Sequence, residues 1–472
     1  MKGPREAEMD RRRYLKILGF TLGAAEIGAA VYAAWKAKPM RFGSLFPQPP
    51  AWMRCLPPSI LRGRVVSWEQ DASLAGRYVA PRFREAYPRV ELEYKSYSWG
   101  VRRMKFDVAL MFNVDLPSTV LHECRYLLSL MYRLPGKLLD LSDHVKPYLG
   151  YFSEGDLAIL SGGEPGRVLA VPLNETPPCT YYNSEAFRRA GIAAEDLETF
   201  QDWVEAGMTI VHRKRLAKTF MVMDPASWGM EILYRIPCWD EDLYPLFDED
   251  FHIEFLNDYR RLRLENRLVR DAPFYSPEYW EAYGAGEAVF YTGYEWWGLS
   301  LMERCPQASG IFRVAPHLRH DPDRRAMAPL KGVYPIPAGL PEGDRETAWR
   351  YLEFTFCNPD SMVEAWGDAP MEDITEFFLF PAHKEFRRRI LLDRRVPFYG
   401  GQEIYRIWDE ASTIGEAHHF PPETLLVYFY YGRKAEEALL GGKTARQACR
   451  SVQEKALELR RKRLKGTLGI HL

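Results

Sequence analysis

Aromatic, carboxylate and amide side chains follow several apolar segments of this sequence. Trp68, Glu69 and Asp71 come at the end of one such segment, and Asp224 and Trp228 follow another. Sugars present hydroxyl edges and apolar C–H faces, so carboxylates and amides bind the edges while aromatic rings stack on the faces. These residue types together predict a ligand-binding site that offers both hydrogen-bonding groups and stacking surfaces.

The short motifs of the common enzyme classes are missing. There is no GxSxG, no P-loop, no GxGxxG after a strand and no HExxH. The segment His122-Glu123-Cys124 lacks a second histidine, and the adjacent pair His418-His419 lies in a predicted loop, where neighbours rarely converge on one metal. Carboxylate pairs such as Asp368 and Glu372 fit solvated helix faces as well as acid–base roles. We therefore expect no enzyme activity, no cofactor and no bound metal.

Strands that alternate with helices predict an α/β fold from residue 64 onward. Strands are expected at 64–68, 89–97 and 105–112, with a helix at 73–88 between the first two. Ligands bind beyond the carboxyl ends of the strands in such sheets. That rule selects these candidate contacts: Trp68, Glu69, Asp71, Trp99, Phe112, Asn113, Asp224 and Trp228.

The rest of the chain continues the α/β pattern and then becomes helical. Further elements are expected as a helix at 119–134, a strand–loop–strand at 166–183, helices at 184–192 and 196–212, a second α/β region at 218–268, an extended segment at 332–340, and almost only helices from 346 onward. A chain of 472 residues is long for one core, so two or three domains are expected.

The charge balance argues against nucleic acid as a partner. The net charge is −1, but residues 1–38 hold eight Lys/Arg against four Asp/Glu. Only 6 Asn and 7 Gln occur beside 63 Lys/Arg and 64 Asp/Glu, a balance that favours a thermophilic source. Seven widely spaced cysteines, without a CxxC, make a structural zinc site unexpected.

The first 62 residues have the parts of an export segment. Arg11, Arg12 and Arg13 precede an apolar stretch from Ile17 to Ala34, and "RRRYLK" is similar to a twin-arginine motif. No clear cleavage site follows. We predict a signal or anchor segment at 1–38, uncleaved, and a proline-rich linker at 39–62 that holds the remaining chain on the outer face of the membrane.

Several stretches, in order, resemble the extracellular solute-binding proteins of ABC importers, and are closest to the large sugar-binding family (family 1) that includes maltose-binding protein. The stretches are "RFREAYPRVELEY", "KFDVALMF", "LLDLSDHVKPYL", "VPLNETPPCTYYNSEAFRRAGI", "GEAVFYTGYEWW", "ETAWRYLEFTFCNPDSM" and "EEALLGGKTARQACRSVQEK". The resemblance extends over residues 63–460. It implies a periplasmic-binding-protein-like fold, in which two α/β lobes are joined by a hinge and a ligand binds in the cleft between them.

The resemblance also implies boundaries, contacts and partners. A first lobe would comprise 63–170 with 292–340, and a second lobe 173–290 with 345–472, with hinge strands near 171–173 and 291–293 and a third crossing at 335–350. By the same likeness Asn174, Glu175 and Thr176 follow the first hinge strand as polar contacts, and Tyr428 takes the place of a stacking tryptophan. The partner would be a membrane permease of the ABC class, and we expect a monomer.

Of two adjacent tryptophans, one is expected to contact the ligand and the other to lie in the core. If a helix begins near Glu295, Trp296 and Trp297 point about 100° apart, so both cannot face one ligand. Trp297 has Leu301 at i+4 and is the core candidate, whereas Trp296 is the ligand platform.

The function predicted is therefore capture of a small solute, a carbohydrate before others, for a membrane permease. Two alternatives stay open: the same fold binding a polyamine, a metal or another small solute such as an organophosphate, or a tethered glycan-active enzyme. Iron binders of this fold use paired tyrosines, and Tyr181-Tyr182 is such a pair in a poor position.

Overall fold

The computed structural model describes residues 61–465 except 71, 162–163, 165, 228–236, 241, 317–329 and 413–420. The predicted anchor, nearly all of the proline-rich linker and the pair His418-His419 lie outside the described residues. Within the ranges that are described, no helix is both long and apolar enough to span a membrane.

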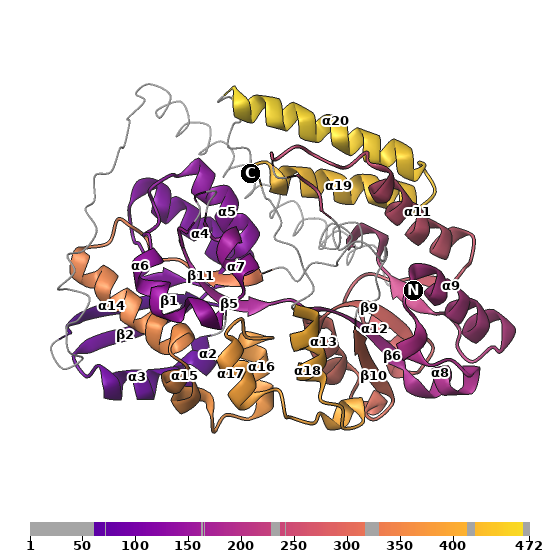
Figure 1. The fold of residues 1–472 in the computed structure, drawn as a ribbon, viewed down its shortest axis with the longest axis horizontal. Coiled ribbons are helices and arrows are strands. Elements are labelled where there is room, and N and C mark those ends of the chain that lie inside the picture. Colours follow the sequence, from indigo (N-terminus) through magenta and orange to yellow (C-terminus); the bar gives the residue numbers. More distant parts are fainter. Residues whose placement is uncertain are drawn as a thin grey trace, which may run out of the picture. The chain divides into compact units, whose positions relative to one another are not determined.

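A parallel sheet of three strands begins the described chain (Figure 1). Strand β1 (Gly63–Glu69) lies between β2 (Val90–Ser96) and β3 (Thr119–Val120). Helical turns at α2 (Ala72–Leu74), a π-helical segment (Ala75–Val79) and α3 (Ala80–Ala86) connect β1 to β2, as the sequence predicted.

The prediction of a strand at 105–112 is wrong, because this segment is the second half of helix α4 (Trp99–Phe112). The buried residues of α4 are Arg102, Phe106, Ala109 and Leu110, which follow helical spacing. The exposed face of α4 is also apolar, through Met104, Val108 and Phe112. A helix with apolar side chains on both faces resembles a buried strand in sequence, and the third strand of the sheet is instead Thr119–Val120.

A second sheet joins distant segments. Strand β11 (Leu330–Tyr334) pairs antiparallel with both β4 (His122–Glu123) and β5 (Val171–Glu175). The helix expected at 119–134 is therefore shorter than predicted, since β3 and β4 occupy its start and α5 covers only Cys124–Arg133.

Further strands form two more sheets. Strand β6 (Pro178–Asn183) lies antiparallel between β9 (Phe290–Tyr294) and β10 (Phe312–Pro316). Strands β7 (Met221–Met223) and β8 (Val269–Asp271) pair in parallel. The helices of this part are α8 (Ser184–Ala190), α9 (Phe200–Gly207), α11 (Asp250–Leu264), α12 (Pro277–Gly284) and α13 (Glu295–Arg304).

Helices joined by short loops make up the described chain beyond residue 341, as predicted. Their bounds are α14 (Glu342–Leu352), a π-helical segment (Glu353–Cys357), α15 (Pro359–Trp366), α16 (Met371–Phe378), α17 (Lys384–Ile390), α18 (Ile404–Ser412), α19 (Thr424–Leu439) and α20 (Ala445–Leu464). Between β4 and β5 lie α6 (Ser142–Val145), a 3₁₀ helix (Lys146–Tyr151) and α7 (Glu154–Ile159).

The packing of these elements distinguishes two groups, which meet where α19 packs on α5. Helix α14 packs on β1 and α15 on the segment Ala75–Val79, so in Figure 1 the orange helices lie beside the indigo strands. Helix α18 packs on β6 and β10, while α19 and α20 pack on each other and on α11. We call residues 61–175 with 330–390 the first lobe, and residues 178–316 with 404–412 and 424–464 the second lobe.

These groups differ from the predicted lobe boundaries. Strand β10 and most of β9 fall in the range predicted for the first lobe, but both pair with β6, which falls in the range predicted for the second lobe. Residues 291–293 are therefore not a crossing, and 335–350 lead into α14 within the first lobe. The chain crosses at 176–177, directly after the predicted 171–173, then between β10 and β11, and again between α17 and α18.

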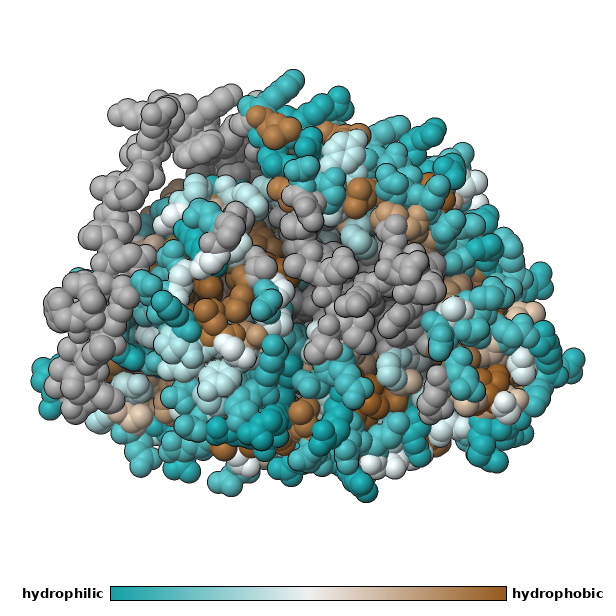
Figure 2. Space-filling view, viewed as in Figure 1, coloured by the Kyte–Doolittle hydropathy of each residue, from teal (hydrophilic) through white to brown (hydrophobic). Residues whose placement is uncertain are grey.

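Buried apolar side chains from both lobes form the hydrophobic core, and a smaller set of polar and charged side chains is buried with them. Figure 2 shows hydrophilic side chains over most of the face in view, with apolar ones gathered in smaller areas. Trp366 and Trp408 are among the largest fully buried side chains, one from each lobe. The large aromatic content of 14% is thus used mainly in packing.

Candidate ligand-binding site

The carboxyl ends of β1 and β2 meet at one edge of the first lobe. The Tyr97 backbone N–H donates to the Glu69 carbonyl at 2.9 Å, which joins the ends of the two strands. The Tyr97 ring lies edge-on to Trp68, with 5.2 Å between centroids. Trp99 follows at the start of α4 and is 37% exposed. The structure therefore brings together three predicted contacts, Trp68, Glu69 and Trp99.

Within this group Trp68 and Glu69 are core residues. The Glu69 carboxylate accepts hydrogen bonds from the Ser67 hydroxyl at 2.6 Å and from the Tyr334 hydroxyl at 2.5 Å, so it connects β1 to β11. Burial raises the pKa of the Glu69 carboxyl, although both hydrogen bonds and the Arg102 charge act to lower it. Trp68 is only 4% exposed. The accessible side chains of this edge include Tyr97, Trp99 and Lys105, and the Lys105 ammonium lies 5.2 Å from the Tyr97 ring.

His122 and Glu123 belong to the same edge, and the sequence reasoning missed them. They come directly after β3, which is the third strand of the parallel sheet. The rule that ligands bind beyond the carboxyl ends of strands therefore selects them in place of the residues after 105–112. His122 is buried against Phe106, and its Nδ1 lies 3.0 Å from the Glu123 carbonyl. Burial lowers the pKa of this imidazole. The signal that could have found them is "DLPSTVLHE", where Pro117 ends the helical pattern before a short β-branched strand.

The structure does not bring Phe112 and Asn113 to this edge. They end α4, and a helix of 14 residues places them about 20 Å from Trp99 at 1.5 Å per residue. Asn113 has a left-handed backbone (φ 57°), which terminates the helix. Its side chain packs on Gly339, in the space that the Cβ of a larger residue at position 339 would need. Their selection depended on the wrong strand, so both are corrected to helix-end residues.

Asn174, Glu175 and Thr176 lie at the first crossing and are all buried. The Asn174 side-chain oxygen accepts from the Gly332 N–H at 2.8 Å, and this contact holds β5 against β11. The Glu175 carboxylate accepts from the Arg387 guanidinium at 2.6 Å. Both side chains thus hold β5 against other elements of the first lobe, and their role as ligand contacts stays a prediction.

Arg387 connects the crossing to the second lobe. Its Nη1 binds Glu175 and the Pro381 carbonyl, and its Nε lies 2.9 Å from the carboxylate of Asp409 on α18. The Arg387 side chain is 1% exposed. Nearby, burial raises the pKa of Asp156 well above its usual value, and repulsion by the Glu175 carboxylate raises it further. One buried guanidinium therefore links residues of both lobes beside the two-residue crossing.

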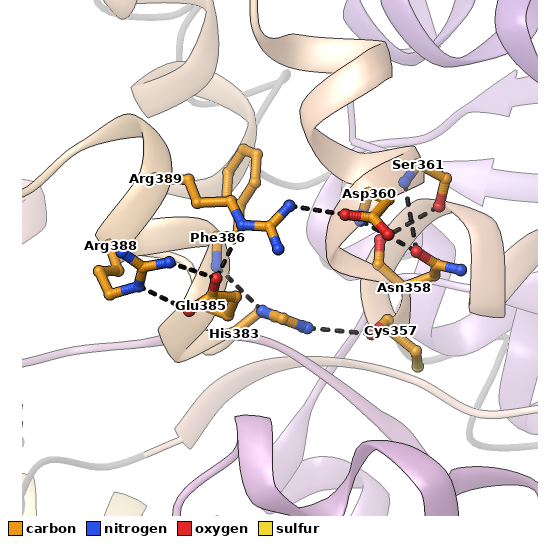
Figure 3. A network of polar contacts seen from close by, with 9 residues as sticks. All are labelled: Cys357, Asn358, Asp360, Ser361, His383, Glu385, Phe386, Arg388 and Arg389. Atoms are coloured by element: carbon orange, nitrogen blue, oxygen red, sulfur yellow. Dashed lines mark hydrogen bonds and ion pairs between the residues drawn. The ribbon is translucent and has the colours of Figure 1, made fainter.

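A polar network holds the helix that carries Arg387 (Figure 3). The His383 ring accepts from the Phe386 N–H at 3.1 Å through Nδ1, and its Nε2 lies 2.9 Å from the Cys357 carbonyl. Arg389 joins Glu385 on α17 to Asp360 at the start of α15. These contacts fix α17 to the first lobe.

In the second lobe, Asp224 and Trp296 both contact Phe274. The Asp224 carboxylate accepts from the Phe274 N–H at 3.0 Å, so it connects the ends of β7 and β8. The Trp296 ring lies 5.8 Å from Phe274 and 6.2 Å from both Tyr275 and Tyr294. We call Phe274, Tyr275, Tyr294 and Trp296 the second-lobe aromatic group. It lies at the carboxyl ends of β8 and β9.

The two adjacent tryptophans differ as predicted in their burial. Helix α13 begins at Glu295, as expected, and Trp297 is fully buried with its ring stacked on Tyr291 at 4.0 Å. The Trp297 indole N–H donates to the Tyr279 hydroxyl at 2.8 Å. The core role of Trp297 is therefore confirmed. Trp296 is half-buried beside Tyr275, which is 39% exposed, and its role as a platform stays a prediction.

The other predicted contacts are separate from these two groups. Tyr428 on α19 is buried, with its ring 5.7 Å from Trp239. Asp71 and Trp228 lie outside the described residues. The part of the chain that the structure describes contains no cluster of three His, Cys, Asp or Glu side chains that could hold a metal ion.

The arrangement of sheets and crossings is a periplasmic-binding-protein-like fold, and comparison with solved structures agrees. An ABC transporter associated binding protein from B. animalis subsp. lactis, solved with beta-1,6-galactobiose, has a TM-score of 0.63 at 18% identity over 86% of this chain and 98% of its own. UgpB from Mycobacterium tuberculosis, solved with glycerophosphocholine, has a TM-score of 0.66 at 18% identity over 85% and 99%. At these identities the likeness concerns the fold.

Residues 113–371, more than half of the chain, match the bacterial extracellular solute-binding protein family, and the chain belongs to this family. The resemblance found in the sequence is thus confirmed, and the family is one of binding proteins, not enzymes. The arabinooligosaccharide-binding protein of Halalkalibacterium halodurans is 24% identical over 298 residues, 60% of this chain and 64% of that protein. The chain therefore spans just under two thirds of this curated relative.

Proposed function

We propose that the chain is the solute-binding component of an ABC importer and that its solute is a carbohydrate. The observation that carries this proposal is the placement of aromatic and polar side chains at strand ends in both lobes. Trp99 and Tyr97 supply rings in the first lobe, and the second-lobe aromatic group supplies Trp296 and Tyr275. Rings of this kind stack on the C–H faces of a sugar, while nearby polar groups bind its hydroxyls.

The crossings suit transport by closure of two lobes on a ligand. A solute that contacts both lobes binds the closed state more tightly than the open state. The difference between these two binding free energies shifts the population toward the closed state. Only 176–177 separate β5 of the first lobe from β6 of the second, so bending is confined to few residues there. The permease would recognise the closed state, and the chain would act as a monomer.

The membrane tether is part of the proposal. The apolar stretch Ile17–Ala34, the arginines before it and the proline-rich linker support an anchored protein on the outer face of the membrane. Fractionation of cells that produce the full chain tests this, because release of the protein into the medium would contradict the tether.

Thermal-shift screening followed by calorimetry tests the carbohydrate assignment. We expect the full chain to gain thermal stability with at least one oligosaccharide, and Trp296→Ala to weaken that binding while the melting temperature without ligand is kept. The control is Phe429→Ala, which removes an exposed ring on α19 and should leave binding unchanged. A shift with polyamines or metal ions, and with no mono- or oligosaccharide, would contradict the proposal.

A second candidate is a phosphorylated small solute. It is favoured by the fold shared with UgpB, which was solved with glycerophosphocholine. The same screen includes glycerophosphocholine and hexose phosphates, so the two candidates are distinguished by which compounds raise the melting temperature.

A further inference from the structure

Arg387 on α17 is fixed to the first lobe by several contacts. Its Nη1 donates to the Glu175 carboxylate at 2.6 Å and to the Pro381 carbonyl at 3.1 Å. The guanidinium also lies over the Phe380 ring, 4.6 Å from its centroid, and the side chain is 1% exposed. Helix α17 itself packs on α15 of the same lobe. The guanidinium therefore has little freedom of its own and moves with the first lobe.

Asp409 on α18 moves with the second lobe. Helix α18 packs on β6 and β10, two strands of the central sheet of that lobe, and the preceding residue Trp408 is fully buried. The Asp409 carboxylate lies 2.9 Å from the Arg387 Nε. Because each partner is fixed to its own lobe, this distance depends on how the two lobes are placed relative to each other.

The other ion pairs of α17 stay within the first lobe. Arg388 pairs with Glu385 of the same helix, and Arg389 pairs with Glu385 and, at 2.7 Å, with Asp360 near the start of α15 (Figure 3). The pairs of Arg389 with Asp360 and of Arg387 with Asp409 thus involve the same residue types and the same helix. Only the second of them depends on the position of the other lobe.

The contact between Arg387 and Asp409 can open without leaving a buried charge alone. Arg387 keeps the Glu175 carboxylate as its partner, and the Asp409 side chain is 33% exposed, so water can hydrate it. The Arg387 Nε–H makes no hydrogen bond in the described structure, so the contact is an attraction between charges. Such an attraction weakens as the charges separate. The pair therefore favours the arrangement in which it is short, but does not make that arrangement permanent.

We propose that Asp409 is a positioning residue, whose ion pair with Arg387 restrains the two lobes in the protein without solute. A neutral contact acts beside it, since the Phe380 ring of the first lobe lies edge-on to Trp408 at 5.9 Å. The population of the lobe arrangements determines the apparent affinity for any solute. Asp409 would thus adjust affinity without contacting the solute. The inference rests on the proposed function only in requiring lobes that close.

Interlobe distances in the solute-free full chain test this inference. Nitroxide labels at Arg82→Cys on α3 and Arg188→Cys on α8 replace exposed side chains, one in each lobe, and pulsed electron paramagnetic resonance gives the distances between them in detergent. Cys55→Ser removes the cysteine outside the described residues, and the other six are buried. We expect Asp409→Asn to lower the population at the wild-type distance, relative to other distances, about two- to five-fold, as befits a partly exposed ion pair.

Matched variants separate a restraint between lobes from a general structural role. Asp360→Asn removes the acidic partner of Arg389 within the first lobe and should keep the wild-type distances. Asp409→Glu keeps the charge and should restore them, whereas Asp409→Ser should behave as Asp409→Asn does. We expect the melting temperature of Asp409→Asn to be nearly unchanged, because Arg387 keeps Glu175.

Two results would overturn the inference. One is a wild-type distance distribution in Asp409→Asn and Asp409→Ser, and the other is an equal change in Asp360→Asn. Because no solute is present, either result leaves the carbohydrate assignment standing. Conversely, a shift of population in Asp409→Asn, together with no carbohydrate that raises the melting temperature, would overturn the proposed solute and support the restraint.

Discussion

His383 makes the stability of the protein depend on pH in a calculable way. It is 1% exposed and caps α17, where Nδ1 accepts from the Phe386 N–H and Nε2 faces the Cys357 carbonyl. The ring must be neutral to accept, and desolvation by burial is the main cause that lowers the pKa of His383 from 6.5 to about 4. At 1.36 kcal/mol per pH unit, this interval corresponds to about 3 kcal/mol of unfolding free energy.

The sign follows from proton binding. Between pH 6.5 and about 4 the unfolded chain binds a proton at His383 and the folded chain does not, so acid favours unfolding. The contribution is fully present above pH 6.5, decreases through this window and is absent below about pH 4. Asp156 has the opposite effect, because burial raises its pKa and the folded state holds the proton.

The variant His383→Asn isolates this contribution. Asparagine caps α8 in this protein, where the Asn183 side chain accepts from the Ala186 N–H at 3.0 Å, so the cap at α17 is kept without a titrating ring. Urea unfolding read by tryptophan fluorescence should show the wild type losing about 3 kcal/mol more than the variant between pH 7.5 and 4. Other titrating groups are common to both proteins and cancel. Equal losses in the two proteins would refute the argument.

Three further predictions concern packing and charge. Trp297→Ala should lower the unfolding free energy by about 3–5 kcal/mol, since it removes a fully buried ring stacked on Tyr291, and calorimetric unfolding would show it. Trp296→Ala should change stability by far less, and a loss equal to that of Trp297→Ala would contradict its half-buried position. Arg387→Met should cost about 3–5 kcal/mol because it leaves the Glu175 carboxylate buried without its partner, and adding Glu175→Gln should recover part of that loss in chemical denaturation.

The sequence predicted the fold class and most elements because their patterns are local. A short apolar segment predicted β1, an alternating segment predicted β2, helices were expected at 184–192 and from Glu295, and the burial of Trp297 followed from its spacing to Leu301. The order of family-like stretches added the periplasmic-binding-protein-like fold, which the likeness to solved structures supports.

Failures arose where structure depends on distant partners. Residues 105–112 are apolar on both helix faces, and only the pairing of β3 with β1 decides which segment is the strand. The lobe boundaries depend on β9 and β10 pairing with β6, which no local pattern encodes. The Arg387–Glu175 pair joins residues 212 positions apart, so the buried role of Glu175 was invisible in the sequence.

The position of β11 has a consequence for how the chain folds as it is synthesised. Strand β11 joins β4 to β5, so this sheet of the first lobe needs residues 330–334, whereas the sheet of β2, β1 and β3 is complete at residue 120. The sheet of β6, β9 and β10 is complete once residue 316 has been made. We therefore expect the sheet of β6, β9 and β10 in the second lobe to form earlier during translation than the sheet of β4, β5 and β11 in the first lobe, because β4 and β5 wait for a strand that follows them by more than 150 residues.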